Sequence, residues 1–128
     1  MIYLDTSVVL ARLFAEDRSP PDGFWSQTFV ASRLLEFEVF NRLHARADVA
    51  SYAVDARQLV DRGKLLEMSE AVLGRALLPF LPPVHPLDAL HLASMDFLRA
   101  QGVGVVLATY DQRLAQAAVG LGFALADC

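Results

Sequence analysis

Acidic residues that interrupt apolar segments are the part of this sequence that could carry chemistry. Asp5 interrupts the segment IYLDTSVVL, Asp88 lies among apolar neighbours in PLDALHLASM, and Asp111 comes three residues after an apolar run that ends at Ala108. A carboxylate this close to a buried strand costs free energy unless it is paired or binds a metal ion. Each aspartate also stands where it could simply cap a helix. Position alone therefore leaves both interpretations open.

A fourth acid, Glu38, lies in the helical segment SRLLEFEVFNRL. It shares a helix face with Leu34, whereas Glu36 points elsewhere and is interpreted as solvent-facing. A lone glutamate on a helix is usually solvated, so Glu38 gains meaning only from its arrangement with the other acids. His91 follows Asp88 by one helical turn and could be a ligand or a base, but a packed, hydrogen-bonded histidine is the more common outcome.

Short apolar runs alternate with amphipathic stretches along the chain, which predicts strands alternating with helices. The expected strands cover residues 2–4, 29–31, 65–68, 103–108 and 123–125. The expected helices cover residues 8–14, 33–46, 49–62, 69–78, 87–100 and 111–119. Ser7, Ser32 and Ser69 are expected to cap the first, second and fourth of these helices. This order favours a three-layer α/β/α fold with a parallel sheet of four or five strands. The first and fourth strands, apolar on both faces, are expected to be neighbours at its centre.

The carboxyl ends of the strands are where an open parallel sheet forms its functional crevice. Asp5 directly follows the first strand and Asp111 follows the fourth, while Asp88 opens a helix and Glu38 can reach the same edge from a flanking helix. Four such carboxylates repel one another, and one or more would be protonated unless cations lie between them. Oxygen ligands select hard ions such as Mg²⁺ or Mn²⁺, which activate water and stabilise the leaving oxygen in phosphoryl chemistry.

The composition limits the class of protein. A length of 128 residues suits one domain, residues 1–128, and no apolar run approaches the roughly 18 residues that a membrane span needs. A single cysteine, Cys128, cannot form an internal disulfide, so we expect a reducing, cytoplasmic environment. The net charge of −4 is unusual for a nucleic-acid binder, although bound cations would offset it. Ten of the eleven basic residues are arginines, which bind phosphate well, but compositional drift is the favoured explanation for them.

Four segments in a fixed order carry a family resemblance: IYLDTSVVL, ASRLLEFEVFNRL, PLDALHLASM and LATYDQRLAQAAVGLGF. They resemble the PIN-domain family, and within it the VapC-type toxins of bacterial toxin–antitoxin pairs, over nearly the whole chain. The resemblance implies an endoribonuclease that depends on Mg²⁺ or Mn²⁺. The metal-binding catalytic acids that it implies are Asp5, Glu38, Asp88 and Asp111. Positions that often support such a site by hydrogen bonds are matched by Thr6, Ser7 and Thr109.

The resemblance also implies partners. They are an RNA substrate, a small antitoxin protein whose tail covers the active site, and a second copy of the chain in a homodimer. The apolar excess of the composition points to a homodimer as well, and the helical region of residues 49–78 is the segment most available for it.

Three alternatives stay open at this point. A phosphatase or a phospho-accepting receiver also has an acidic pocket, but the first strand offers LDTS without a second aspartate two positions on, and the only lysine, Lys64, lies mid-chain. A PIN fold could process RNA or cleave DNA without being a toxin. A non-catalytic binding module could use the acids only as helix caps.

Overall fold

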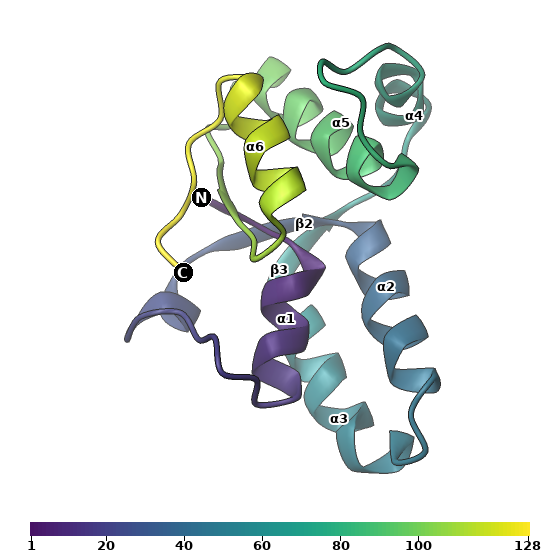
Figure 1. The fold of residues 1–128 in the computed structure, drawn as a ribbon, viewed down its shortest axis with the longest axis vertical. Helices are drawn as coiled ribbons and strands as arrows, with labels where there is room; N and C mark the ends of the chain where they lie inside the picture. Colours follow the sequence, from purple (N-terminus) through teal and green to yellow (C-terminus); the bar gives the residue numbers. More distant parts are fainter.

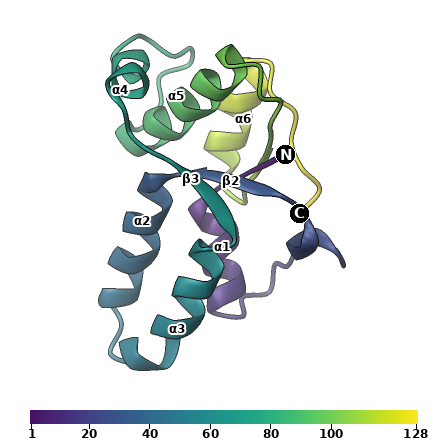
Figure 2. The same cartoon turned by 180° about the vertical axis from the view of Figure 1, so that it is seen from behind.

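The computed structural model describes residues 1–128 as a small parallel sheet with helices on both faces (Figures 1 and 2). In chain order the elements are β1 (Ile2–Leu4), α1 (Thr6–Leu13), the 3₁₀ turn η1 (Phe24–Ser26), β2 (Phe29–Ser32), α2 (Arg33–His44), α3 (Val49–Val60), β3 (Gly63–Leu66), α4 (Glu70–Ala76), α5 (Pro86–Ala100), β4 (Val106–Ala108) and α6 (Gln112–Gly120). All strand pairs are parallel, in the order β3-β2-β1-β4. The predicted α/β/α fold with a four- or five-stranded parallel sheet is confirmed.

The pairing of β1 with β4 confirms that the first and fourth strands are neighbours, with Leu4 opposite Ala108. Two details differ from the prediction. The fourth strand covers three residues rather than residues 103–108, because its neighbour β1 offers only three residues to pair with. It also lies at the edge of the four-stranded ladder rather than at its centre. Beyond it, a single parallel bridge joins Leu107 to Leu125 where a fifth strand was predicted.

Two hydrophobic clusters cover the two faces of the sheet, because successive residues of a strand point to opposite sides. Leu4 of β1 packs into the cluster formed with α1, α2 and α3. Tyr3 points the other way, into the cluster formed with α4, α5 and α6. Figure 1 shows the same division, with α1, α2 and α3 below the sheet and α4, α5 and α6 above it. Leu35, Val39 and Leu43, which are spaced about one turn apart along α2, all belong to the first cluster.

Several helices and strands begin or end a few residues away from their predicted bounds. Ser32 and Ser69 cap α2 and α4 as predicted. The first helix begins two residues early because Asp5, rather than Ser7, is its cap. The third helix, predicted to end at residue 62, ends at Val60, and Gly63 opens β3, where an added Cβ would lie 3.4 Å from the Cβ of Phe29. No helix of the structure has the length and apolar character needed to cross a bilayer.

Candidate active site

The carboxyl ends of β1 and β4 form one side of the candidate active site. In the order β3-β2-β1-β4, the strands that follow β1 in the chain, β2 and then β3, lie on one side of it, and the last strand, β4, lies on its other side. Such a reversal point is where open α/β sheets leave a crevice for ligands. Asp5 follows β1 directly at this point, and its backbone N–H donates to the carbonyl of Ala108 at 3.0 Å. Asp5 is buried, with only 6% of its surface exposed.

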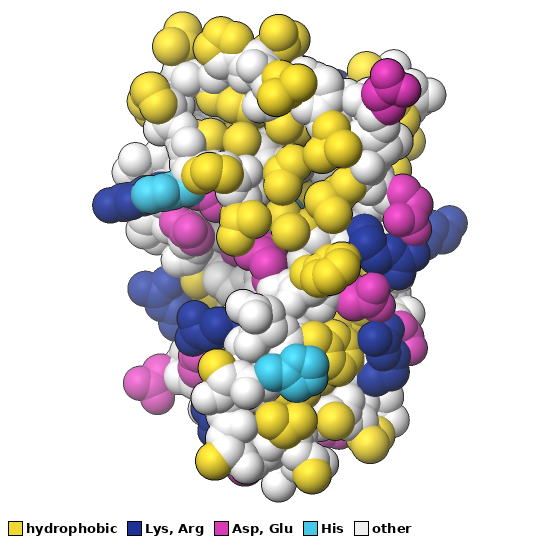
Figure 3. Space-filling model, turned by 90° about the vertical axis from the view of Figure 1, so that its right-hand side faces the viewer, with side chains coloured by type: hydrophobic (Ala, Val, Ile, Leu, Met, Phe, Trp, Pro, Cys, Tyr) yellow, Lys and Arg dark blue, Asp and Glu magenta, His cyan; other side chains and the backbone are white.

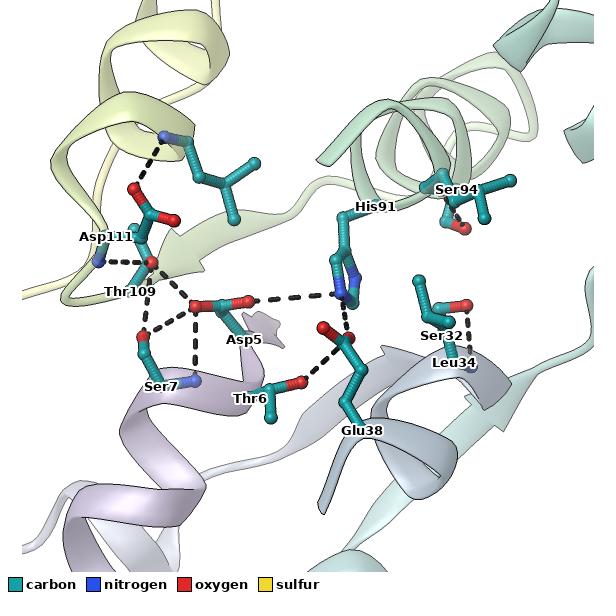
Figure 4. Close-up of polar contacts among 12 residues, drawn as sticks. Asp5, Thr6, Ser7, Ser32, Leu34, Glu38, His91, Ser94, Thr109 and Asp111 are labelled. Atoms are coloured by element: carbon teal, nitrogen blue, oxygen red, sulfur yellow. Dashed lines mark hydrogen bonds and ion pairs between the residues drawn. The ribbon is translucent and has the colours of Figure 1, made fainter. Parts of the chain in front are cut away.

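Hydrogen bonds from three donors hold one oxygen of Asp5 in place (Figure 4). Asp5 Oδ2 accepts from the backbone N–H of Ser7 at 3.2 Å, from the Ser7 hydroxyl at 2.6 Å and from the Thr109 hydroxyl at 2.8 Å. The other oxygen, Oδ1, faces Nε2 of His91 at 3.9 Å, which is too far for a hydrogen bond. Asp5 therefore caps α1 with one oxygen and keeps the other free.

The turn after β4 is tied to α1 by the same hydroxyl groups. Thr109 Oγ1 accepts from the backbone N–H of Asp111 at 2.9 Å, and Ser7 Oγ accepts from the backbone N–H of Tyr110 at 2.9 Å. Asp111 in turn caps α6 with Oδ1, which accepts from the N–H of Arg113 at 2.9 Å. The two hydroxyl side chains thus fix the spacing between Asp5 and Asp111.

Glu38 reaches the site from α2, on the other side of Asp5. Its Oε1 accepts from the Thr6 hydroxyl at 2.9 Å and lies 2.6 Å from Nε2 of His91. Glu36 behaves differently. It forms an ion pair with Arg57 at a distance of 2.7 Å, and this pair does not belong to the site. The structure thus places Glu38 beside His91 and Asp5, whereas Glu36, half-buried rather than fully solvent-facing, pairs with Arg57 and Arg33.

His91 and Tyr3 form a buried pair behind Glu38 that the sequence did not assign to the site. His91 is 1% exposed, and its Nδ1 lies 2.9 Å from the Tyr3 hydroxyl. A neutral imidazole satisfies both contacts if Nε2 donates to Glu38 and Nδ1 accepts from Tyr3. Burial lowers the pKa of His91, but the hydrogen bond to Glu38 and the charges of Asp5, Glu38 and Asp88 outweigh it and raise the pKa. The signal in the sequence was a tyrosine inside a buried strand, whose hydroxyl needs a partner.

Asp88, the third residue of α5, is half-buried, and its side chain makes no hydrogen bond in the structure. Burial raises its pKa, and the negative charges of Asp111 and Asp5 raise it further, whereas His91 and His85 oppose the shift. The three aspartates are thus close enough for their charges to act on one another. This is the mutual repulsion that the sequence analysis expected of clustered carboxylates.

The donor chemistry of the cluster matches a hard divalent cation. Oxygens that accept no hydrogen bond remain on all four acids: Oδ1 of Asp5, Oε2 of Glu38, both oxygens of Asp88 and Oδ2 of Asp111. No group of three or more Asp, Glu, His or Cys side chains is arranged to hold a metal ion as the side chains lie. The oxygen set fits Mg²⁺ or Mn²⁺ by type, while its side chains do not converge on one point.

Comparison with known proteins places this arrangement in a family. The model of the PIN domain matches residues 2–120. The chain is 29% identical over 134 residues to Ribonuclease VapC47 of Mycobacterium tuberculosis (strain CDC 1551 / Oshkosh), covering 99% of this chain and 96% of that protein.

Solved structures share the fold at low sequence identity. The VapBC2 complex of Rickettsia felis, bound to a DNA fragment from its promoter, contains a chain with a TM-score of 0.68 and 13% identity, covering 98% of both chains. VapBC-1 of nontypeable Haemophilus influenzae contains one with a TM-score of 0.65 and 16% identity, covering 99% of this chain and 98% of that one. Because the family model spans almost the whole chain, from the first strand to the last helix, the protein belongs to the PIN-domain family.

Proposed function

We propose that this protein is an endoribonuclease that hydrolyses RNA phosphodiester bonds with Mg²⁺ or Mn²⁺. The observation that carries the proposal is the cluster of Asp5, Glu38, Asp88 and Asp111, with free carboxylate oxygens on every member and with a raised pKa at Asp88. Membership of the PIN-domain family and the similarity to Ribonuclease VapC47 support it.

In this proposal Asp5, Asp88 and Asp111 hold the ion, and Glu38 completes the site directly or through a water molecule. The bound ion supplies Lewis-acid chemistry: it activates water and offsets the negative charge that develops on the phosphate. The hydroxyl groups of Thr6, Ser7 and Thr109 each donate a hydrogen bond to Glu38 or Asp5 and hold these two carboxylates in place. Such bonds orient these two ligands before the ion binds.

The biological role we propose is that of the toxin of a toxin–antitoxin pair, with a small antitoxin protein as partner. The similarity to chains in the VapBC complexes supports this role over RNA processing without an antitoxin. Expression of the chain alone in its host should arrest growth, and co-expression of the neighbouring gene should restore it. Growth that is unaffected by the active enzyme would favour the processing role.

We also propose that the protein is a homodimer. Large apolar side chains are exposed on α4, on the segment that follows it and at the start of α5: Leu73 at 44%, Leu77 at 87%, Leu78 at 58%, Leu81 at 82% and Leu87 at 49%. Figure 3 shows apolar side chains gathered on the upper half of one face, over α4 and α5. A patch of this kind is typical of a protein interface. It overlaps the end of the predicted dimer segment, residues 49–78, and extends beyond it.

The nuclease proposal is tested by cleavage of total host RNA with Mg²⁺, with EDTA and with two variants. Asp88→Asn keeps the size of the side chain, so a purely structural residue would tolerate the change. A metal ligand would not, and we expect activity to fall by about 100-fold or more. Glu36→Gln is the matched control, because Glu36 lies outside the site and pairs with Arg57. Cleavage that survives EDTA, or that survives in Asp88→Asn, would contradict the mechanism.

A further inference from the structure

A cleft of about 370 Å³ opens beside Asp88, between the start of α5 and the first turns of α6. Its walls combine the proline-rich segment before α5 with three polar side chains, His85, Arg113 and Gln116. The volume is in the range of small-ligand sites in proteins. The cleft shares Asp88 with the acidic cluster, so a molecule bound in it would lie next to the proposed reaction centre.

Arg113 is the positively charged group of this cleft, which Asp88 also lines, and it forms no ion pair with a carboxylate. Five of the ten arginines form ion pairs with acidic side chains, namely Arg33, Arg46, Arg57, Arg75 and Arg99. Arg113 instead places Nη1 at 2.7 Å from Nε2 of His85. Because a guanidinium only donates, His85 Nε2 is the acceptor in this contact. The imidazole thus orients the guanidinium across the cleft without cancelling its charge.

The other walls of the cleft suit a nucleotide rather than a simple anion. Pro82, Pro83 and Pro86 line one side, and proline rings offer a flat apolar surface on a backbone whose φ is fixed. Gln116, one turn after Arg113, supplies an amide that can both donate and accept hydrogen bonds. Together these groups match the parts of one nucleotide: the guanidinium suits the phosphate, the apolar wall suits the face of the base, and the amide suits its hydrogen-bonding edge.

We propose that this cleft binds the nucleotide next to the scissile bond of a single-stranded RNA, with Arg113 holding its phosphate. The inference rests on the proposed ribonuclease function and adds a substrate subsite to it. It also offers a reason why a chain with a net charge of −4 can bind RNA, since one uncompensated arginine stands beside the acidic cluster. An unpaired single strand suits the cleft, because its bases are free to leave the stack and lie against a side wall.

Binding of a fluorescently labelled, random-sequence 20-nucleotide RNA, in EDTA and over a series of salt concentrations, tests the subsite without cleavage. Arg113→Gln should weaken binding about tenfold. Because one phosphate contact is lost, the logarithm of the association constant should also fall less steeply with the logarithm of the salt concentration, by about 0.7 in slope. Arg113→Lys should keep the parent's salt slope. Arg12→Gln is the matched control, because Arg12 is also exposed and without an acidic partner but lines other clefts. With Mg²⁺, Arg113→Gln should raise KM and leave kcat near that of the parent.

The outcomes separate this inference from the ribonuclease proposal. If the parent cleaves RNA while Arg113→Gln and Arg12→Gln bind and cleave alike, the subsite is wrong and the nuclease stands. If the parent does not cleave RNA, the nuclease proposal fails, and the salt series still reports whether Arg113 contacts the labelled RNA. A parent that fails to bind the RNA pool at all also overturns the subsite. Thermal melting of each variant shows that the comparison is made between folded proteins.

Discussion

At the scale of single residues, the acids combine two roles that the sequence presented as alternatives. Asp5 and Asp111 each cap a helix with one carboxylate oxygen and leave the other oxygen free. Capping and metal binding are compatible because a carboxylate has two oxygens. Asp5, Asp88 and Asp111 drew attention in the sequence because each follows a strand or lies near a helix start, whereas Glu38, in the middle of α2, was proposed from the family resemblance. Thr6, Ser7 and Thr109, which the resemblance offered as supporting residues, do form hydrogen bonds to Glu38 and Asp5. The Tyr3–His91 pair could not be predicted, because these residues are 88 positions apart and meet only in the fold.

The Tyr3–His91 contact leads to a prediction on stability. Tyr3→Phe keeps the buried ring but removes the hydroxyl that bonds to His91. The imidazole Nδ1 would then be buried without a partner, so the free energy of unfolding should fall by about 1–3 kcal/mol. Tyr110→Phe is the matched control, because the Tyr110 hydroxyl is buried without a hydrogen-bond partner. Its removal should be neutral or stabilising. Urea unfolding of both variants checks this, and equal losses would show that the contact contributes nothing.

At the scale of helices and strands, the order of elements was predictable and their ends were less so. Apolar periodicity is a local property of the sequence, and it predicted each of the six helices. The extent of a strand depends on its neighbour, which is why the fourth strand is limited by β1. The packing of α4 on α5 could not be predicted either. It includes an ion pair from Arg75 to Asp96 at 2.8 Å, and Asp96 is shared with Arg99 at 2.7 Å.

This shared carboxylate predicts a stability that depends on pH. Burial raises the pKa of Asp96, but the hydrogen bonds and charges of Arg75 and Arg99 outweigh it and lower the pKa. A carboxyl with a lowered folded-state pKa stabilises the protein above its unfolded pKa of about 3.9, and this contribution is lost as pH falls through the folded pKa. Asp96→Asn should therefore reduce the free energy of unfolding by about 1 kcal/mol at pH 7. The difference from the parent should shrink as the pH falls below about 4.

A control for this prediction is Asp61→Asn. Asp61 pairs with Arg57 at 3.2 Å, but 60% of its side chain is exposed, so solvent screens the pair. Its replacement should change stability less than that of Asp96 at pH 7. Denaturant unfolding at several pH values measures both variants. A loss in Asp96→Asn that is the same at pH 7 and pH 3 would show that its cause is packing rather than charge.

At the scale of the whole molecule, polar and apolar surfaces are divided between two regions. Asp88, Arg113 and the cleft between them lie where the start of α5 meets the start of α6. The exposed leucines lie on α4, on the segment after it and, with Leu87, at the start of α5. Composition predicted an apolar excess but could not predict where it would be exposed, because that depends on which helix faces the sheet leaves uncovered. The leucine patch reaches Leu87, the residue before Asp88, so a dimer formed through it would border the acidic cluster.

The proposed dimer gives the final prediction, on oligomeric state. Leu77 is 87% exposed, so its removal should not disturb the monomer's core, and burying it in an interface would contribute about 1.5–3 kcal/mol. Leu77→Glu places a charge in that interface and should shift the protein to the mass of a monomer at micromolar concentration. Val54→Glu is the matched control on α3, because Val54 is 67% exposed and lies outside the leucine patch. Light scattering on size-exclusion fractions measures both variants. A parent of monomer mass rules out the dimer, and a dimer broken by Val54→Glu but not by Leu77→Glu would place the interface on α3.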